Sequence, residues 1–324
     1  MSTVHTGRKD KIVMQQKRPF LIDCDTGTDD AIAIIAALYS SEIEVCAITS
    51  VNGNVPHRFV AQNNLDLVEY LGVDIPVSRG ADQPFRDRGY HSDGTHGKTG
   101  LGNVQLPTAQ HRQFDAKIAS QMIYDTALAK GGELELLVTG PMTNIAIALL
   151  EHPDLPGLIR HLYFMGGAAT GGNVTPTAEF NIWVDPEAAH VVTQSGIPMT
   201  MVGLDVTLKA AMLPEDSAAI RAVNTRAGTV VADLLDYMFV RHAAGGEDAL
   251  MHDALALAAA LCPDCMTYEH CFVDVECAGT YTLGHTFVDR RGRSKKAPNV
   301  SVALDLDVPK FRAWLVEKVT QSAK

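Results

Sequence analysis

The stretch "FLIDCDTGTDDAIAI", residues 20–34, places four aspartates within eight positions, directly behind an apolar run. The apolar run has the pattern of a buried strand, and Gly27 allows a sharp turn after it. Asp29 and Asp30 then open a second apolar segment, which has the pattern of a helix. A strand, a turn and a helix in this order form the first unit of an α/β fold.

The same alternation of strand and helix patterns continues along the chain. Strands are predicted at residues 19–24, 43–51, 75–80, 133–140, 161–167 and 199–206. Helices are predicted at residues 29–40, 56–72, 115–130, 142–151, 186–195, 214–224, 228–242 and 252–261. This pattern predicts an α/β fold with a mostly parallel central sheet flanked by helices, a Rossmann-like open sheet.

The C-terminal part of the chain has a different pattern. Residues 270–289 and 299–307 read as strands of a small antiparallel edge addition, and residues 308–319 as a closing helix. Neither a repeat nor a linker divides the chain, so residues 18–324 are predicted to form a single domain. Residues 1–17 are predicted to be a flexible N-terminal extension.

Composition and charge restrict the possible partners. The 324 residues have a formal net charge of −11, and the basic cluster at residues 290–296 is typical of a solvated loop. Nucleic acid is not expected to bind, because contact with its phosphate backbone needs clustered Lys and Arg. The N-terminus lacks the apolar core of a signal peptide, and no apolar run approaches the ~18 residues of a membrane span. A cytoplasmic protein without membrane contact is therefore expected.

The aspartate cluster needs a positive partner. Four carboxylates this close repel one another and raise one another's pKa. A single carboxylate at a helix N-terminus is a good cap, which would account for Asp29 alone but not for Asp23, Asp25 and Asp30 as well. A cluster of oxygen donors without His or Cys favours a hard divalent cation, with calcium ahead of magnesium.

A second polar segment is "GGNVTPTAEFNIWVDPEAAH", within which Asn173, Glu179 and Asn181 supply amide and carboxylate groups. Such groups suit sugar hydroxyls, which both donate and accept hydrogen bonds. Turn chemistry explains the same residues about equally well. The segment overlaps one of two irregular stretches, residues 80–114 and 168–183, and long polar loops in a compact domain are usually functional or mobile.

Four shorter segments are weaker signals. In "MHDALALAAAL", His252 and Asp253 begin a helix, and a capping Asp beside a packed surface His is the default explanation. "LVTGPMTN" ends a strand at Thr139, whose backbone carbonyl is a candidate metal ligand. The segments that contain Asn54 and His96 are too generic to rank alone.

Together, these segments resemble the nucleoside hydrolases of the inosine–uridine type over residues 18–320. "DCDTGTDDA" is similar to the family's N-terminal aspartate cluster, with Thr26 where Pro is frequent. "MGGAATGGNVTPTAEFNIWVDPEAA" resembles its sugar-binding segment, and "MHDALAL" its His-Asp pair, with Ala254 in place of a frequent Pro. The tail "KAPNVSVALDLD" is nearest to the broad-specificity ribonucleoside hydrolases.

The resemblance implies Ca²⁺-dependent hydrolysis of the N-glycosidic bond of purine or pyrimidine ribonucleosides, in nucleoside salvage, by a homodimer or homotetramer. The implied calcium ligands are Asp25, Asp30, the Thr139 carbonyl and Asp253. The implied contacts to the ribose 2′- and 3′-hydroxyls are Asp29, Asn54 and Asn181. The implied contacts around the 5′-hydroxyl are Met165, Asn173 and Glu179, with Phe180 packing near the sugar. His96 and His252 are implied to face the base.

The chemistry suggests two catalytic roles. Asp25 is placed to take a proton from water as general base, and His252 has a pKa suited to protonating the departing base. Base preference stays open, because its determinants would lie in the two irregular stretches. Residues 242–251 lack a tyrosine that some family members have, so the lid over the base is also open.

Two other functions remain as alternatives. A haloacid-dehalogenase-type phosphatase also has an Asp-x-Asp pair after a strand, but it would leave the Asn173–Asn181 segment without a role. A non-catalytic ribose or nucleoside receptor could use the same hydroxyl-binding residues without activating water.

Overall fold

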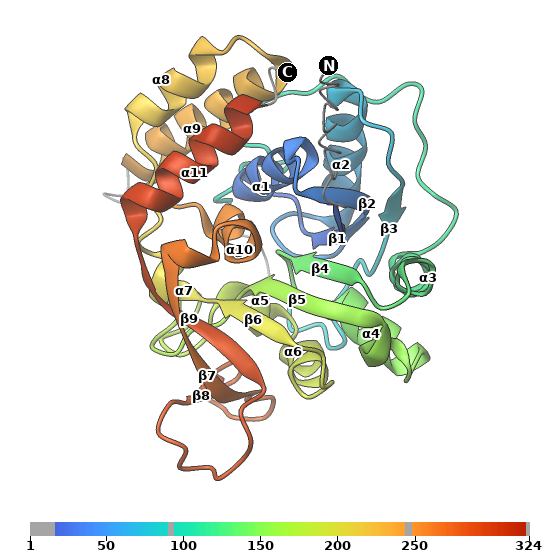
Figure 1. Cartoon of the computed structure of the whole chain (residues 1–324), viewed down its shortest axis with the longest axis vertical. Coiled ribbons are helices and arrows are strands. Elements are labelled where there is room, and N and C mark those ends of the chain that lie inside the picture. Colours follow the sequence, from blue (N-terminus) through green and yellow to red (C-terminus); the bar gives the residue numbers. More distant parts are fainter. Residues whose placement is uncertain (1–16, 90–93, 244–247, 322–324) are drawn as a thin grey trace, which may run out of the picture.

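The computed structural model describes residues 17–89, 94–243 and 248–321. Within them, nine strands form one sheet in the order β3-β2-β1-β4-β5-β6-β9-β7-β8 (Figure 1). The strands are β1 (Arg18–Cys24), β2 (Ile43–Ser50), β3 (Val77–Arg79), β4 (Leu134–Val138), β5 (Ile159–Met165), β6 (Met199–Val202), β7 (Met266–Val275), β8 (Thr286–Asp289) and β9 (Val300–Leu306). The pairs from β3 to β9 are parallel, whereas β7 is antiparallel to both β9 and β8. The predicted sheet with an antiparallel edge is confirmed.

Helices cover both faces of this sheet (Figure 1). They are α1 (Thr28–Tyr39), α2 (His57–Leu71), α3 (Ala119–Lys130), α4 (Thr143–Glu151), α5 (Phe180–Val184), α6 (Pro186–Thr193), α7 (Leu204–Thr207), α8 (Pro214–Ala222), α9 (Arg226–Ala243), α10 (His252–Leu261) and α11 (Val308–Thr320). Side chains alternate along β1: Phe20 and Ile22 join the core under α1, α2 and α8–α11, while Leu21 joins the core under α3, α4 and α6. Because β1 is buried on both faces, it reads as a continuous apolar run.

Four predicted features were wrong, and one of them is the start of β7, which lies at Met266 and not at residue 270. Leu204–Thr207 form the short helix α7 rather than a continuation of β6, because an apolar run does not distinguish a strand from a buried helical turn. Helix α3 begins at Ala119, four residues after the predicted start. Phe180–Val184 are helical within a stretch predicted to be irregular.

Strand β9 comes from late in the chain but lies inside the sheet. It pairs in parallel with β6 and in antiparallel with β7. The C-terminal segment therefore completes the central sheet and does not merely extend its edge. Residues 1–16, which make up most of the predicted extension, lie outside the described residues. Among the helices that are described, none has the length and apolar character needed to cross a membrane.

Candidate active site

Four aspartates meet at the carboxyl end of the parallel strands. Asp25 follows β1, Asp29 and Asp30 lie in the first turn of α1, and Asp253 lies in the first turn of α10. All four are buried, with exposed fractions of 1%, 4%, 0% and 3%. One carboxylate oxygen from each of Asp29, Asp30 and Asp253 lies within 4.8 Å of the others. The acidic cluster therefore occupies the edge where folds of this type bind their ligands.

Burial is the largest cause of raised pKa values in this cluster, and neighbouring carboxylates add to it. The pKa of Asp30 rises to about 6, and those of Asp25 and Asp253 rise well above their usual range. Asp25 Oδ1 and Asp29 Oδ1 are buried without a hydrogen-bond partner among the described residues. Such atoms cost free energy unless a cation or a hydroxyl meets them. The donor set therefore fits a hard divalent cation.

The orientation of Asp30 is fixed by three donors. The Gly27 backbone N–H donates to Asp30 Oδ2 over 2.8 Å, and the Asn54 side-chain amide donates to the same oxygen over 3.2 Å. The Thr139 hydroxyl donates to Asp30 Oδ1 over 2.7 Å. These contacts tie the turn after β1, the loop after β2 and the end of β4 to a single carboxylate.

Asp25 is held from the loop after β2. The Asn54 backbone N–H donates to Asp25 Oδ2 over 2.8 Å. A Cβ atom on Gly53 would lie 1.9 Å from that oxygen, so only glycine fits beside it. Asn54 thus organises two carboxylates, and its implied contact with the sugar remains a prediction.

Asn181 links the cluster to the next strand. Its side-chain amide donates to the Thr139 carbonyl over 2.7 Å and to the Met165 carbonyl over 3.1 Å. A carbonyl oxygen has two lone pairs, so Thr139 can accept this bond and still serve as a metal ligand. The structure therefore brings Asn181, Thr139 and Met165 together, and the ligand roles that the resemblance implies for them remain predictions.

The segment before α5 is folded around Glu179. Its Oε2 accepts from the Gly167 N–H over 2.8 Å, and its Oε1 accepts from the Asn181 N–H over 3.0 Å, which caps α5. Burial raises the pKa of Glu179 to about 7. The Asn173 side-chain oxygen accepts from the Phe180 N–H over 2.9 Å. The resemblance implies four residues around the sugar in this segment. They are Asn173, Glu179, Phe180 and Asn181, and they form one compact corner.

The two histidines stand at two helix N-termini. His96 Nδ1 accepts from the Thr28 N–H over 3.1 Å and lies 3.8 Å from Asp29 Oδ1. His252 Nδ1 lies 2.9 Å from the Thr207 hydroxyl, and His252 precedes Asp253 directly in α10. The His96 imidazole is thus next to a carboxylate of the cluster, whereas His252 adjoins Asp253 along the chain. Contact of either histidine with a base remains a prediction.

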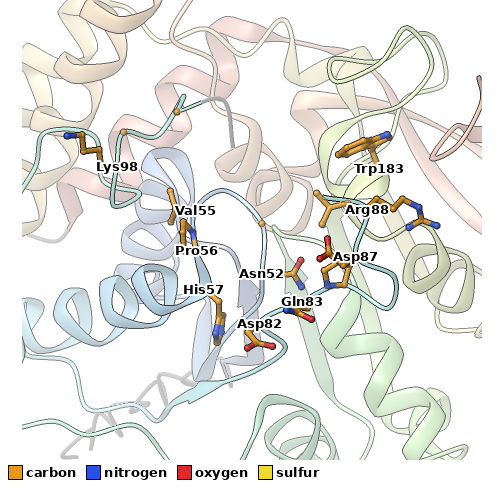
Figure 2. A pocket seen from close by; sticks show the side chains of 15 residues that line it. Asn52, Val55, Pro56, His57, Asp82, Gln83, Asp87, Arg88, Lys98 and Trp183 are labelled. Carbon is orange, nitrogen blue, oxygen red and sulfur yellow. The ribbon is translucent and has the colours of Figure 1, made fainter. Parts of the chain in front are cut away.

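A pocket of about 620 Å³ adjoins the cluster on the side of Gly53. The two irregular stretches of the chain meet around it, with Trp183 at one end and Lys98 toward the other (Figure 2). It is lined by Asn52, Gly53, Val55, Pro56, His57, Asp82, Gln83, Pro84, Asp87, Arg88, Gly94, Gly97, Lys98, Trp183 and Val184. Because Gly53 also backs onto Asp25, the pocket is directly beside the acidic cluster.

Sequence reasoning missed four residues of this region. Thr28 and Thr207 hold the two histidines, Trp183 lines the pocket, and Asn144 bonds to the end of β1. Thr28 and Asn144 lie at helix starts, where Thr and Asn are common, and Thr207 ends a short helix, so these residue types alone carried no signal. Asn144 is part of "LVTGPMTN", which drew attention only for its backbone carbonyl.

Known proteins are similar to this chain over nearly its whole length. The family described as "Inosine-uridine preferring nucleoside hydrolase" matches residues 20–313. The pyrimidine-specific ribonucleoside hydrolase RihA of Shewanella woodyi is 40% identical over 309 residues, which cover 94% of this chain and 97% of that protein. The non-specific ribonucleoside hydrolase RihC of Klebsiella pneumoniae is 38% identical over 303 residues, covering 93% and 98%. A solved structure, a purine-preferring ribonucleoside hydrolase from Gardnerella vaginalis, has a TM-score of 0.88 at 33% identity and covers 94% of this chain and 99% of that one.

Proposed function

The chain belongs to the inosine-uridine preferring nucleoside hydrolase family, and from that premise we propose that it hydrolyses ribonucleosides with a bound Ca²⁺. Membership makes it an N-glycosyl hydrolase that acts on ribonucleosides. The observation that carries the calcium proposal is the buried cluster of Asp29, Asp30 and Asp253, with one carboxylate oxygen from each within 4.8 Å of the others and the Asp25 carboxylate beside them. Neither alternative, the phosphatase or the receptor, fits this family.

Four groups would hold the ion: the carboxylates of Asp25, Asp30 and Asp253 and the Thr139 carbonyl. These are oxygen donors only, and a set of several carboxylates with a backbone carbonyl suits the larger coordination shell of Ca²⁺ better than the octahedron of Mg²⁺, which keeps several waters. When bound, the cation keeps the carboxylates ionised and makes water at the site more acidic. Asp29 completes the cluster, and we assign it to the ribose diol.

In the proposed reaction, one residue of the chain acts on the attacking water and another acts on the departing base. Asp25 Oδ1, which has no hydrogen-bond partner among the described residues, is available to take a proton from the attacking water. Breaking the bond to the base leaves an oxocarbenium-like ribose and negative charge on the base. His252, oriented by Thr207, is our candidate for donating a proton to that base.

Sugar recognition follows from the compact corner around α5. We propose that Asp29, Asn54 and Asn181 contact the 2′- and 3′-hydroxyls, and that Asn173, Glu179 and the Met165 segment receive the 5′-hydroxyl beside Phe180. Holding the diol in this way fixes the reacting carbon relative to Asp25, and such orientation contributes a large part of enzymatic rate enhancement.

Ribosides should be cleaved about 10–10³-fold better than 2′-deoxyribosides, as kcat/KM. Losing one hydroxyl leaves one or two buried polar groups unpaired, at about 1–3 kcal/mol each. Comparing inosine with 2′-deoxyinosine tests this, and 5′-deoxyinosine, which keeps the diol, tests the proposed 5′-hydroxyl contacts separately. Equal values for inosine and 2′-deoxyinosine would contradict the assigned sugar site.

Removal of the metal should make the free energy of unfolding depend on pH through the aspartate cluster. In the metal-free cluster the pKa of Asp30 is raised from 3.8 to about 6, and those of Asp25 and Asp253 lie higher than usual. A raised folded-state pKa stabilises the protein fully below the unfolded pKa, and this stabilisation is lost as the pH rises through the folded pKa.

The melting temperature in chelator should therefore fall by several degrees between pH 4.5 and 8, and saturating Ca²⁺ should remove that fall. Differential scanning calorimetry with and without Ca²⁺ measures both curves. The Asp30→Asn variant without metal should show a shallower slope, since one titrating group is gone. Parallel curves with and without Ca²⁺ would refute a metal held by this cluster.

Base preference, location and assembly complete the proposal. The relatives named above differ in their base preference, so we propose activity on purine and pyrimidine ribonucleosides without ranking them. We further propose a cytoplasmic homodimer or homotetramer that acts in nucleoside salvage without a nucleic acid or membrane partner. A reducing-sugar assay with inosine, guanosine, uridine and cytidine, with and without Ca²⁺, tests the function directly, and no sugar release from any of them would reject it.

A further inference from the structure

Asn144, in the first turn of α4, contacts the carboxyl-terminal regions of three strands with one buried side chain. Its Nδ2 donates to Asp23 Oδ1 over 2.7 Å and to the Ser50 carbonyl over 3.0 Å. Its Oδ1 accepts from the Ala81 N–H over 2.8 Å. Asp23 and Ser50 end β1 and β2, and Ala81 opens the segment after β3. The side chain therefore fixes the carboxyl ends of three strands against the start of α4.

Each of these three attachments leads to the acidic cluster or its pocket. Asp23 lies two positions before Asp25, the proposed general base. Ser50 begins the short turn to Asn54, which bonds to both Asp25 and Asp30. The segment that Ala81 opens supplies one wall of the pocket.

The backbone at Gly80 approaches this side chain closely. A Cβ atom on Gly80 would lie 2.3 Å from Asn144 Oδ1. The preceding residue reinforces the same wall: the Thr143 hydroxyl donates to Asp185 Oδ2 over 2.7 Å, and that oxygen also accepts from the Phe85 N–H over 2.9 Å. The start of α4 thus holds two points of the pocket wall.

We propose that Asn144 is a positioning residue for the hydrolysis. It does not touch the substrate; it fixes the distance between Asp25 and the sugar by holding β1, β2 and the pocket wall together. The inference rests on the proposed function, because it needs Asp25 to act on the attacking water. Displacement of a reacting group by about 1 Å can cost 10²-fold in rate.

The test compares Asn144→Leu with Asn299→Leu. Asn299 is the control, since its half-buried side chain likewise makes three hydrogen bonds, all of them with the backbone of Thr193 and Val273, at the antiparallel edge. Asn144→Leu should lower kcat by about 10–10²-fold on inosine and on 4-nitrophenyl riboside alike, with KM within about threefold. Asn299→Leu should lower the melting temperature similarly and leave kcat within about twofold.

A second pair of variants keeps the test decisive where leucine is poorly tolerated. Asn144→Asp preserves the size of the side chain and removes its donors, so it should also lose kcat. Adding Asp23→Asn to it restores a side-chain hydrogen bond in the reverse direction, and kcat should recover at least about fivefold relative to Asn144→Asp.

Several results would overturn the inference. One is wild-type kcat in the folded Asn144→Leu or Asn144→Asp variant, and another is an equal loss of kcat in Asn299→Leu. Equal kcat in Asn144→Asp and in the double variant would also overturn it. An inactive wild-type protein would instead reject the proposed function, so the two failures are distinguishable.

Discussion

Asp25→Asn is expected to lower kcat about 10⁴-fold, on 4-nitrophenyl riboside as well as on inosine. General base catalysis is usually worth about 10²–10⁴-fold, and the upper end is expected because the change also weakens a proposed calcium ligand. Asparagine keeps the size of the side chain, and its oxygen can still accept the hydrogen bond from the Asn54 N–H. The loss would therefore report the missing carboxylate and not a collapsed turn.

A matched control for this variant is Asp216→Asn. Asp216 is a buried carboxylate of α8 that accepts from the Leu213 N–H and pairs with Arg312 of α11. This change should lower the melting temperature and leave kcat unchanged within about twofold. Steady-state kinetics of both variants at saturating Ca²⁺ give the comparison. Activity of Asp25→Asn within tenfold of the wild type would mean that another group takes the proton.

His252→Ala is expected to slow inosine hydrolysis by roughly 10²–10⁴-fold, the usual worth of general acid catalysis. The same variant should leave 4-nitrophenyl riboside nearly unaffected, because nitrophenolate is a stable anion and leaves without a proton. The ratio of kcat on the two substrates therefore separates protonation of the leaving group from activation of the attacking water.

His96→Ala provides the comparison for that ratio. His96 accepts from the Thr28 N–H and lies near Asp29, so it is the next candidate for the acid. An equal loss on both substrates in His252→Ala would indicate that the histidine only supports its neighbour Asp253. Undiminished inosine cleavage in His252→Ala, with a selective loss in His96→Ala, would move the proton donor to His96.

The sequence predicted well those features that depend on residues close together along the chain. Asp25, Asp29 and Asp30 lie within six positions, so their convergence could be read from one strand–turn–helix unit. The alternation of strands and helices also predicted the parallel sheet, because β1 is apolar on both faces. The place of Asp253 in the same cluster could not be read from spacing, and only the family resemblance predicted it.

The rest depends on contacts between distant segments. The donors to Asp30 come from the turn after β1, the loop after β2 and the end of β4, and no periodicity in the sequence encodes that convergence. The pocket forms only where two irregular stretches meet, so Trp183 carried no signal of its own. Helix α7 was missed because its four residues continue the apolar run of β6.

The position of β9 between β6 and β7 has a consequence for the order of folding during synthesis. Val202 ends β6, and its neighbour in the sheet does not begin until Val300, about 100 residues later. At a translation rate of about 5–20 residues per second, the edge of β6 waits roughly 5–20 s for its partner. During that interval the nascent chain exposes an unpaired strand edge, which is a template for aggregation. Losing the last 25 or so residues would likewise remove an internal strand, so premature termination should yield insoluble protein.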